Sequence, residues 1–404
     1  MANTQHILGN TELILSDILI ASLEDDRILR LTACLEKLEH PAQALRLLRD
    51  LCSVRINKRI KHRRVHELIV LIAKTCAWIF RHVEHKEVVA FLHDILTEES
   101  FAPGARLVIN SYLGVASIQV KLKIITLVSI FDGQIPLMKP GEHCLAENAL
   151  HRKIEQFNDL YSINEHIDWG VIFIDDGDDR RSDNLYKHER TSRIIYRELM
   201  KYYAKELTFG KFQVIEMEND VRNSIGSFQG GAIIYGMHKA IQLGADIIFY
   251  TNIDLDSHVG LQGLLLHVLV DGTSQIATGS NRVVGSYLSA PIAYYLYSLI
   301  LNLFVRAQLP IGKILDTHNA FKAFDSRALQ KIIPMSDDGA FDMDMDYFFS
   351  FPDMLLARAR ILGMEIKEIP VAMHRAAPLQ ILPSIKNGLR YYISVWRQGI
   401  YLNC

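Results

Sequence analysis

The segment ADIIFYTNIDLDSH (residues 245–258) places two carboxylates, Asp254 and Asp256, directly after a short apolar run. The β-branched and aromatic residues of this run predict a buried strand. A buried carboxylate is unfavourable unless an opposite charge pairs with it, and two carboxylates this close also repel each other. The segment therefore requires either lysine or arginine partners or a bound cation.

Strand geometry leaves two interpretations open, a bound cation and a solvated turn. If the strand continues through residue 256, Asp254 and Asp256 project to the same side, because side chains alternate along a strand. Two carboxylates facing one point suit Mg²⁺ or Mn²⁺, which can also bind a diphosphate. The alternative is a solvated turn in which His258 caps a helix.

Composition narrows the class of protein. The chain has 404 residues, 49% of them hydrophobic and 22% charged, with a net charge of −2. These values are typical of a soluble globular protein and do not indicate a nucleic-acid partner. The five cysteines are scattered without a CxxC pair, which indicates reduced thiols in a cytoplasmic protein and no zinc. The N-terminus lacks the pattern of a signal peptide.

The pattern of apolar residues along the sequence changes near residue 118. Before it, apolar residues recur at helical spacing, which predicts a helical accessory domain over residues 1–117, either a bundle or a HEAT-like stack. After it, short β-rich runs alternate with helical stretches over residues 118–404. This alternation predicts an α/β domain with a mixed, mostly parallel sheet and helices on both faces. Ligands of such sheets bind at the carboxyl ends of the strands.

Two further elements lie near predicted strand ends. Asp175 and Asp176 close the run VIFIDD and could accept hydrogen bonds from a base or a ribose, or else pair with nearby arginines. Gly230 and Gly231 open a predicted helix, where free backbone N–H groups can approach a phosphate or sugar. A tight connection between elements is the simpler explanation of such a glycine pair.

In order and spacing, three motifs resemble the GT-A fold glycosyltransferases of family 2, and are similar to those of the dolichyl-phosphate mannose and glucose synthases. They are DDGD (175–178), QGGA (229–232) and DLD (254–256). Downstream similarities are TGSNR (278–282), DTHNAFKAFDSRAL (316–329), FDMDMD (341–346) and GMEIKEIPV (363–371).

The resemblance implies three groups of site residues. The nucleotide-sugar group is Asp175, Asp176, Gln229, Gly230, Gly231, Asp254 and Arg282. The ligands of Mn²⁺ or Mg²⁺ are Asp254, Asp256 and His374, and the acceptor side holds Asp316, His318 and Lys322. An inverting transfer also needs a base for the acceptor hydroxyl. Asp344 is the first candidate, Asp346 the second, and Asp353 a third.

Three departures from the family pattern leave the nucleotide base and the sugar open. The first strand runs into SIFDGQIPLMKPGEH (129–143) in place of a P-x-Y-N-E-like loop. Gln229 stands where a lysine is common, and Ala320 replaces the usual glycine.

The leading hypothesis is a metal-dependent inverting glycosyltransferase that uses a UDP- or GDP-sugar. Its acceptor would be a saccharide or a lipid-linked molecule, and its helical segment would serve as an accessory or homo-oligomerisation module. The alternatives are a nucleotidyltransferase and a non-catalytic scaffold with the same fold. A nucleotidyltransferase needs a glycine-rich, lysine-bearing loop after the first strand, which FDGQIPLMKPG (131–141) matches poorly.

Two stretches bear on membrane contact. Residues 287–305 carry no charge, but their proline, tyrosines and polar residues favour a buried or interfacial helix over a membrane span. Residues 55–64 form a basic run, which predicts a solvated face or one docked against acids of the catalytic domain. Together they permit a peripheral membrane contact at an anionic surface.

Overall fold

The computed structural model describes residues 31, 33–35, 37–54, 62–97, 103–130, 134–142, 146–175, 190–217, 229–290, 292–333, 350–374, 392–393 and 395–396. Among the helices that precede the first strand, the described residues include α2 (Pro41–Cys52), α3 (His62–His82), α4 (His85–Thr97) and α5 (Pro103–Ala116). Residues 1–30 lie outside the described part, so a fully helical unit over residues 1–117 stays a prediction.

A seven-stranded sheet lies at the centre of the described chain, in the order β3-β2-β1-β4-β7-β5-β8. Its strands are β1 (Leu122–Ser129), β2 (Ile167–Asp175), β3 (Phe212–Glu216), β4 (Ile247–Asn252), β5 (Ile276–Ser280), β7 (Lys322–Asp325) and β8 (Ile366–Pro370). Only β7 runs antiparallel to its neighbours. The predicted mixed, mostly parallel sheet is therefore confirmed. A separate pair joins β6 (Tyr287–Ser289) to β9 (Ala372–His374) in parallel.

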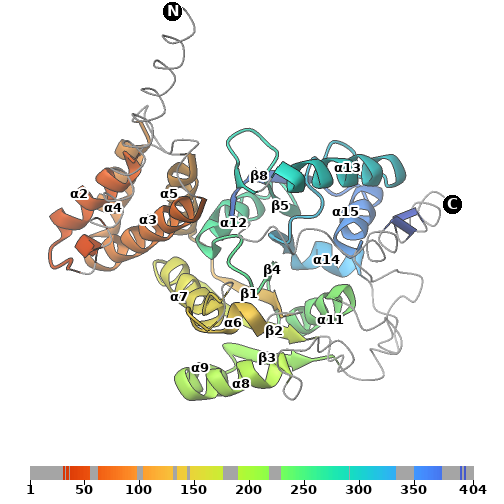
Figure 1. Ribbon diagram of the computed structural model, residues 1–404, viewed down its shortest axis with the longest axis horizontal. Coiled ribbons are helices and arrows are strands. Elements are labelled where there is room, and N and C mark those ends of the chain that lie inside the picture. Colours follow the sequence, from red (N-terminus) through yellow and green to blue (C-terminus); the bar gives the residue numbers. More distant parts are fainter. Residues whose placement is uncertain are drawn as a thin grey trace, which may run out of the picture.

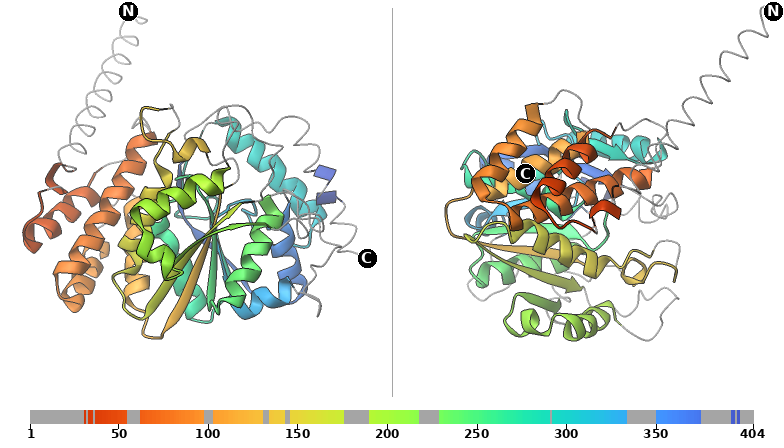
Figure 2. Two further views of the ribbon diagram at one scale, coloured as in Figure 1. Left: turned by 90° about the horizontal axis from the view of Figure 1, so that it is seen from below. Right: turned by 90° about the vertical axis from the view of Figure 1, so that its left-hand side faces the viewer.

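Helices cover both faces of the sheet, as predicted (Figure 1). The first face is covered by α7 (Ala149–Tyr161) and α12 (Gln262–Val270), and α2 to α5 form a further layer outside them. The opposite face is covered by α11 (Gln229–Gln242), α13 (Ile292–Gln308), α14 (Ser326–Ile332) and α15 (Phe351–Ile361). At the β3 edge lie α8 (Thr191–Tyr202) and α9 (Ala204–Thr208), and α6 (Gln134–Leu137) follows β1. Figure 2 shows the strands running side by side between these layers.

The strands divide their apolar side chains between two cores. In β1, Ile124 and Val128 join the core on the α7 and α12 side, whereas Ile125 and Leu127 join the core on the α11 side. This division follows from the two-residue period of a strand and explains why the runs are almost continuously apolar.

The N-terminal helices share the first of these cores. Buried residues of α3 and α5 belong to the same apolar cluster as the sheet residues Phe173 and Phe249. At Gly263 of α12, a methyl group would overlap the backbone oxygen of Ser111 in α5, so the two helices touch through their backbones. Helices α2 to α5 are therefore packed onto the sheet domain rather than tethered to it.

The uncharged stretch 287–305 forms β6 and most of α13. Within the described residues, no helix is long and apolar enough to cross a membrane. Most of the basic run at 55–64 lies outside those residues.

Candidate functional site

Those predicted site residues that the structure describes lie at or near one edge of the sheet. The parallel strands β2, β4 and β5 end there at Asp175, Asn252 and Ser280. The antiparallel β7 begins at the same edge with Lys322. Motifs that lie far apart in the sequence are thus brought to the one edge where parallel sheets bind ligands.

The two carboxylates of the DLD motif lie in a turn, because β4 ends at Asn252, earlier than the strand continuation considered from the sequence. The alternation survives nevertheless. Ile253 and Leu255 are both 3% exposed, whereas Asp254 and Asp256 are partly exposed. The turn is held by the Asp256 N–H, which donates to Asp254 Oδ1 at 3.4 Å. Both acids therefore reach the solvent side of the turn while its apolar residues anchor it.

Strand β9 is fastened to this turn. The His374 N–H donates to the carbonyl oxygen of Asp256 at 2.8 Å, and Ser257 pairs with Met373 in an isolated bridge. The backbone thus places His374 directly beside the acidic turn, although 118 residues separate His374 from Asp256 in the sequence.

A buried lysine lies beneath the turn. Lys153 of α7 is fully buried, and its Nζ donates to the carbonyl oxygen of Asp254. Burial lowers the pKa of Lys153, while Asp254, Asp256 and Glu147 oppose that shift. Glu147 accepts from the Leu255 N–H at 3.3 Å, and burial raises its pKa, with Asp254 adding to the effect.

Part of the counter-charge is therefore supplied by the protein. Lys153 was not predicted from the sequence. Its signal was a lone charged residue on the apolar stripe formed by Leu150, Ile154 and Phe157.

Replacing Lys153 should destabilise the protein. In the Lys153→Met variant, which keeps most of the side-chain volume, we expect unfolding to require about 2 kcal/mol less free energy, since the Asp254 carbonyl loses its donor. Urea titration followed by circular dichroism measures this change. The exposed Lys205→Met is the matched control and should differ from wild type by less than about 0.5 kcal/mol. Equal losses in the two variants would contradict the role of Lys153.

Three histidines line a small pocket between α3 and the acidic turn. They are His66 of α3, His258 after the turn, and His374 of β9. The His66 ring lies 5.8 Å from the His374 ring, nearly parallel to it, and 6.4 Å from the His258 ring. His66 Nε2 is buried without a hydrogen-bond partner. His258 Nδ1 accepts from the Gly260 N–H at 2.9 Å, so this histidine does cap a short helix, η2 (Val259–Leu261).

Two of these imidazoles are neutral in the folded state. Burial lowers the pKa of His66 to about 3 and that of His258 well below its usual value. Sequence reasoning missed His66, because nothing in helix α3 itself indicates that one of its histidines approaches residues that lie almost 200 or more than 300 positions further along the chain.

Stability should fall as the solution is acidified. Between pH 6.5 and about 3, the unfolded chain binds a proton at His66 that the folded chain does not, so the free energy of unfolding decreases as the pH falls. The expected slope is about 1.4 kcal/mol per pH unit for each such histidine. Urea titrations between pH 7 and pH 5 measure it. The His66→Phe variant should show a shallower slope, and equal slopes for the two proteins would contradict the neutral, buried His66.

The first acidic motif is only partly described. Asp175 is buried, and its Oδ2 accepts from the Ser192 N–H at 3.1 Å at the start of α8. Beside it, Glu216 pairs with Arg190 at 2.7 Å and accepts from the Ser192 hydroxyl at 2.5 Å. Asp176 lies outside the described residues. In this structure the Asp175 carboxylate therefore accepts a hydrogen bond from the first turn of α8. Its contact with a nucleotide stays a prediction.

The glycine motif has the predicted placement. Helix α11 begins at Gln229, so Gly230 and Gly231 lie in its first turn. The side chain of Gln229 lies outside the described part of the chain.

The predicted acceptor-side residues form a buried charged cluster. Lys322 is fully buried, and its Nζ donates to the carbonyl oxygens of Thr317, at 3.0 Å, and of Asn319. Burial lowers the pKa of Lys322 to about 8, although Asp316 and Asp353 oppose the shift. Lys322 therefore holds the loop before β7 in place.

Carboxylates close this cluster. Asp316 Oδ2 accepts from the Asn281 N–H at 3.0 Å, which joins the acceptor-side loop to the segment carrying Arg282. Asp353, at the start of α15, is fully buried with its Oδ2 3.7 Å from His318 Nδ1. The structure thus brings His318 to one of the three candidate bases. Asp344 and Asp346, the other two, lie outside the described residues.

The predicted metal ligands do not form a ready-made cage. In the described ranges, no group of three or more His, Cys, Asp or Glu side chains could hold a metal ion. A cation at the turn would therefore need oxygen ligands from another source, such as a diphosphate or water, which is usual for Mg²⁺.

No family model matches the chain, and no curated protein matches it significantly. Among solved structures, glucosyl-3-phosphoglycerate synthase from Mycobacterium tuberculosis with Mn²⁺, UDP and phosphoglyceric acid shares 13% identity at a TM-score of 0.43, covering 75% of this chain and 84% of that chain. The same enzyme with Mn²⁺ and UDP-glucose shares 12% identity at a TM-score of 0.40, covering 72% and 83%. Similarity at this level supports no statement about activity.

Proposed function

We propose that this chain is a metal-dependent glycosyltransferase of the GT-A type, which transfers a sugar from a UDP- or GDP-sugar. The observation that carries the proposal is the pair Asp254 and Asp256, which follows β4 at the ligand-binding edge of the sheet, with His374 hydrogen-bonded to the same turn. The described parts of the motifs that resemble family 2 enzymes follow β2, β4 and β5 at the same edge, which adds support.

The metal ion and the diphosphate of the donor would bind at the turn that carries Asp254 and Asp256. Asp256 and His374 would hold Mn²⁺ or Mg²⁺, with Asp254 toward the sugar-nucleotide diphosphate. Bound there, the cation would neutralise charge on the leaving diphosphate. Two protein ligands suffice, since diphosphate oxygens and water complete the shell of such a cation. Lys153 beneath the turn keeps it in shape and offsets part of its negative charge.

The nucleoside would lie toward β2 and α11. Asp175 and Asp176 would accept from the base and ribose, and the backbone N–H groups near Gly230 and Gly231 would approach the sugar or phosphate. Arg282, after β5, would contact the diphosphate; its Nη2 donates to Ser298 Oγ at 2.7 Å, and its Nε is buried without a hydrogen-bond partner.

The acceptor would enter beside the buried charged cluster. An inverting transfer needs a base for the acceptor hydroxyl. Of the three candidate bases the structure describes Asp353, which is buried at the start of α15 with its Oδ2 3.7 Å from His318 Nδ1. Asp344 and Asp346 remain the other candidates. Asp316 and Lys322 would shape the acceptor loop.

Thermal unfolding tests the proposal. The protein would be melted with UDP, GDP, CDP or ADP, each with and without Mn²⁺. A ligand that binds only the native state must raise Tm. We expect UDP or GDP to raise Tm, and to do so only with Mn²⁺. Stabilisation by none of the four would favour a non-catalytic scaffold. The same measurement with UTP, GTP, CTP and ATP tests the second alternative, since stabilisation by these triphosphates alone would favour a nucleotidyltransferase.

A further inference from the structure

Helix α13 exposes an apolar stripe. Leu296, Leu299, Ile300 and Leu303 are 58%, 45%, 60% and 58% exposed, respectively. They lie at spacings of three and four residues, so they occupy one face of the helix. Figure 1 shows α13 at the outside of the molecule, with α15 beneath it.

The stripe is not needed to hold the helix in place. The opposite face of α13 buries Leu301 and Val305, and Leu309 follows in the same core on the second side of the sheet. A helix that packs on a core through one face needs apolar residues only on that face. A second, exposed apolar face therefore indicates an interaction surface.

The charge around the stripe identifies the kind of partner. Residues 272–315 contain no Asp or Glu. Arg306 is exposed and continues the stripe three residues after Leu303, and Lys313 is exposed just beyond the helix. An apolar stripe that is followed by cations, on a segment of sequence without acids, matches an anionic lipid surface, which accepts leucines at the acyl boundary and attracts arginine and lysine at the headgroups.

The inner face of the same helix contacts Arg282 and the loop that carries the predicted acceptor-side residues. Ser298 accepts from Arg282, and Asn302 Oδ1 accepts from the N–H and the hydroxyl of Thr317, at 3.4 and 3.3 Å. Thr317 in turn binds Lys322 through its carbonyl oxygen. The candidate acceptor site and the exposed stripe are thus separated by about one helix diameter, roughly 10 Å.

We propose that the outer face of α13 docks on an anionic membrane surface and brings the acceptor side of the sheet next to the lipid headgroups. A second copy of this chain fits the face less well, since a symmetric contact would bring two acid-free, arginine-bordered stripes together. The inference goes beyond the proposed transferase activity and does not depend on it, because lipid docking requires neither donor nor metal.

Vesicle co-sedimentation of the full chain tests the proposal, with vesicles of phosphatidylcholine alone and with added phosphatidylglycerol. We expect the wild type to sediment with the anionic vesicles. The double variant Leu299→Glu, Ile300→Glu should bind them at least tenfold more weakly. The matched control is Tyr196→Glu with Met200→Glu, a pair that is 52% and 47% exposed on α8 at the far edge of the sheet and should bind as wild type.

Three results would overturn the proposal. The first is a wild type that sediments with neither kind of vesicle. The second is equal loss of binding in both double variants. The third is a wild-type dimer, seen by light scattering, that only the α13 variant dissociates, which would assign the face to a second copy. Circular dichroism checks that the variants fold, and the UDP or GDP shift in Tm reports separately on the donor site.

Discussion

In the Asp256→Asn variant, we expect sugar transfer to fall by about 10²- to 10³-fold, because a cation that stabilises a leaving diphosphate is worth several kcal/mol. Asparagine has nearly the same shape but lacks the charge. The fold should persist, because the His374 N–H donates to the backbone carbonyl oxygen of residue 256 and this hydrogen bond does not involve the carboxylate. Release of the nucleoside diphosphate from UDP- and GDP-sugars measures the loss.

A matched control separates local chemistry from net charge. Asp271, after α12, has a side chain that is 44% exposed and pairs with His267 on the surface. The Asp271→Asn variant changes the total charge equally and should retain wild-type activity. Wild-type activity in Asp256→Asn would remove the acidic turn from the mechanism.

In the Gly263→Ala variant, we expect the free energy of unfolding to fall by about 4 kcal/mol, because the new methyl group would overlap the backbone of Ser111. Backbone atoms cannot rotate away as a side chain can, so α5 and α12 would have to separate. Gly114 belongs to the same contact, since a methyl group there would lie 2.9 Å from the oxygen of Gly263. Chemical unfolding measures the change.

The control is a helical glycine with room for a methyl group. At Gly236 in α11, the nearest atom to an added methyl is a flexible carbon of Leu127, at 3.4 Å. Gly236→Ala should be neutral or stabilising by up to about 1 kcal/mol, since alanine favours a helix. If Gly263→Ala unfolds at the same denaturant concentration as wild type, the N-terminal helices do not pack on the sheet domain through this contact.

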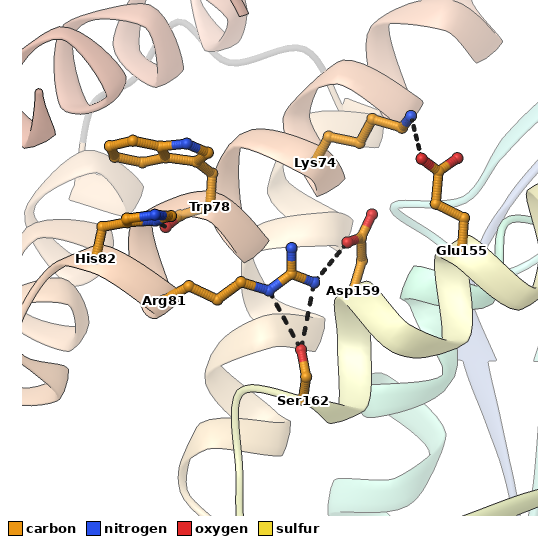
Figure 3. Close-up of polar contacts among 7 residues, drawn as sticks. All are labelled: Lys74, Trp78, Arg81, His82, Glu155, Asp159 and Ser162. Atoms are coloured by element: carbon orange, nitrogen blue, oxygen red, sulfur yellow. Dashed lines mark hydrogen bonds and ion pairs between the residues drawn. The ribbon is translucent and has the colours of Figure 1, made fainter. Parts of the chain in front are cut away.

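Polar contacts add to this packing. Lys74 of α3 pairs with Glu155 of α7 at 2.9 Å, and Arg81 pairs with Asp159 at 2.7 Å (Figure 3). These are partly exposed pairs, which contribute little individually. These pairs come from residues after the basic run at 55–64, so the docking expected of that run stays a prediction. They also fix which face of α3 meets α7.

The strands could be predicted because their signal is local. Strands β1 to β4 are short runs such as IIFY (247–250), whose β-branched and aromatic residues can be recognised without knowledge of a partner, whereas β7, with the sequence KAFD, carries no such signal. Ligand binding at carboxyl strand ends then followed from topology. The sequence left open whether β4 continues through residue 256 or ends in a turn, because a turn held by the Asp256 N–H preserves the same alternation of burial as a strand.

The missed residues depend on tertiary contacts. Lys153 lies 101 residues before its partner Asp254 in the sequence. The ring of His66, in α3, lies 5.8 Å from that of His374, in β9. No periodicity or spacing within α3 or α7 encodes such a partner. The buried state of Lys322 was likewise hidden, because its partners are carbonyl oxygens of a loop.

The most direct test of the central claim is electron paramagnetic resonance of Mn²⁺, which reports free aqueous Mn²⁺ and loses signal when the ion is bound. The protein would be titrated with Mn²⁺ alone and with UDP or GDP, beside the Asp256→Asn variant. We predict that the wild type with one of the two nucleotides removes free Mn²⁺ beyond what the nucleotide removes alone, and that the variant does not. Identical curves for the two proteins would contradict a metal and diphosphate site at Asp254 and Asp256.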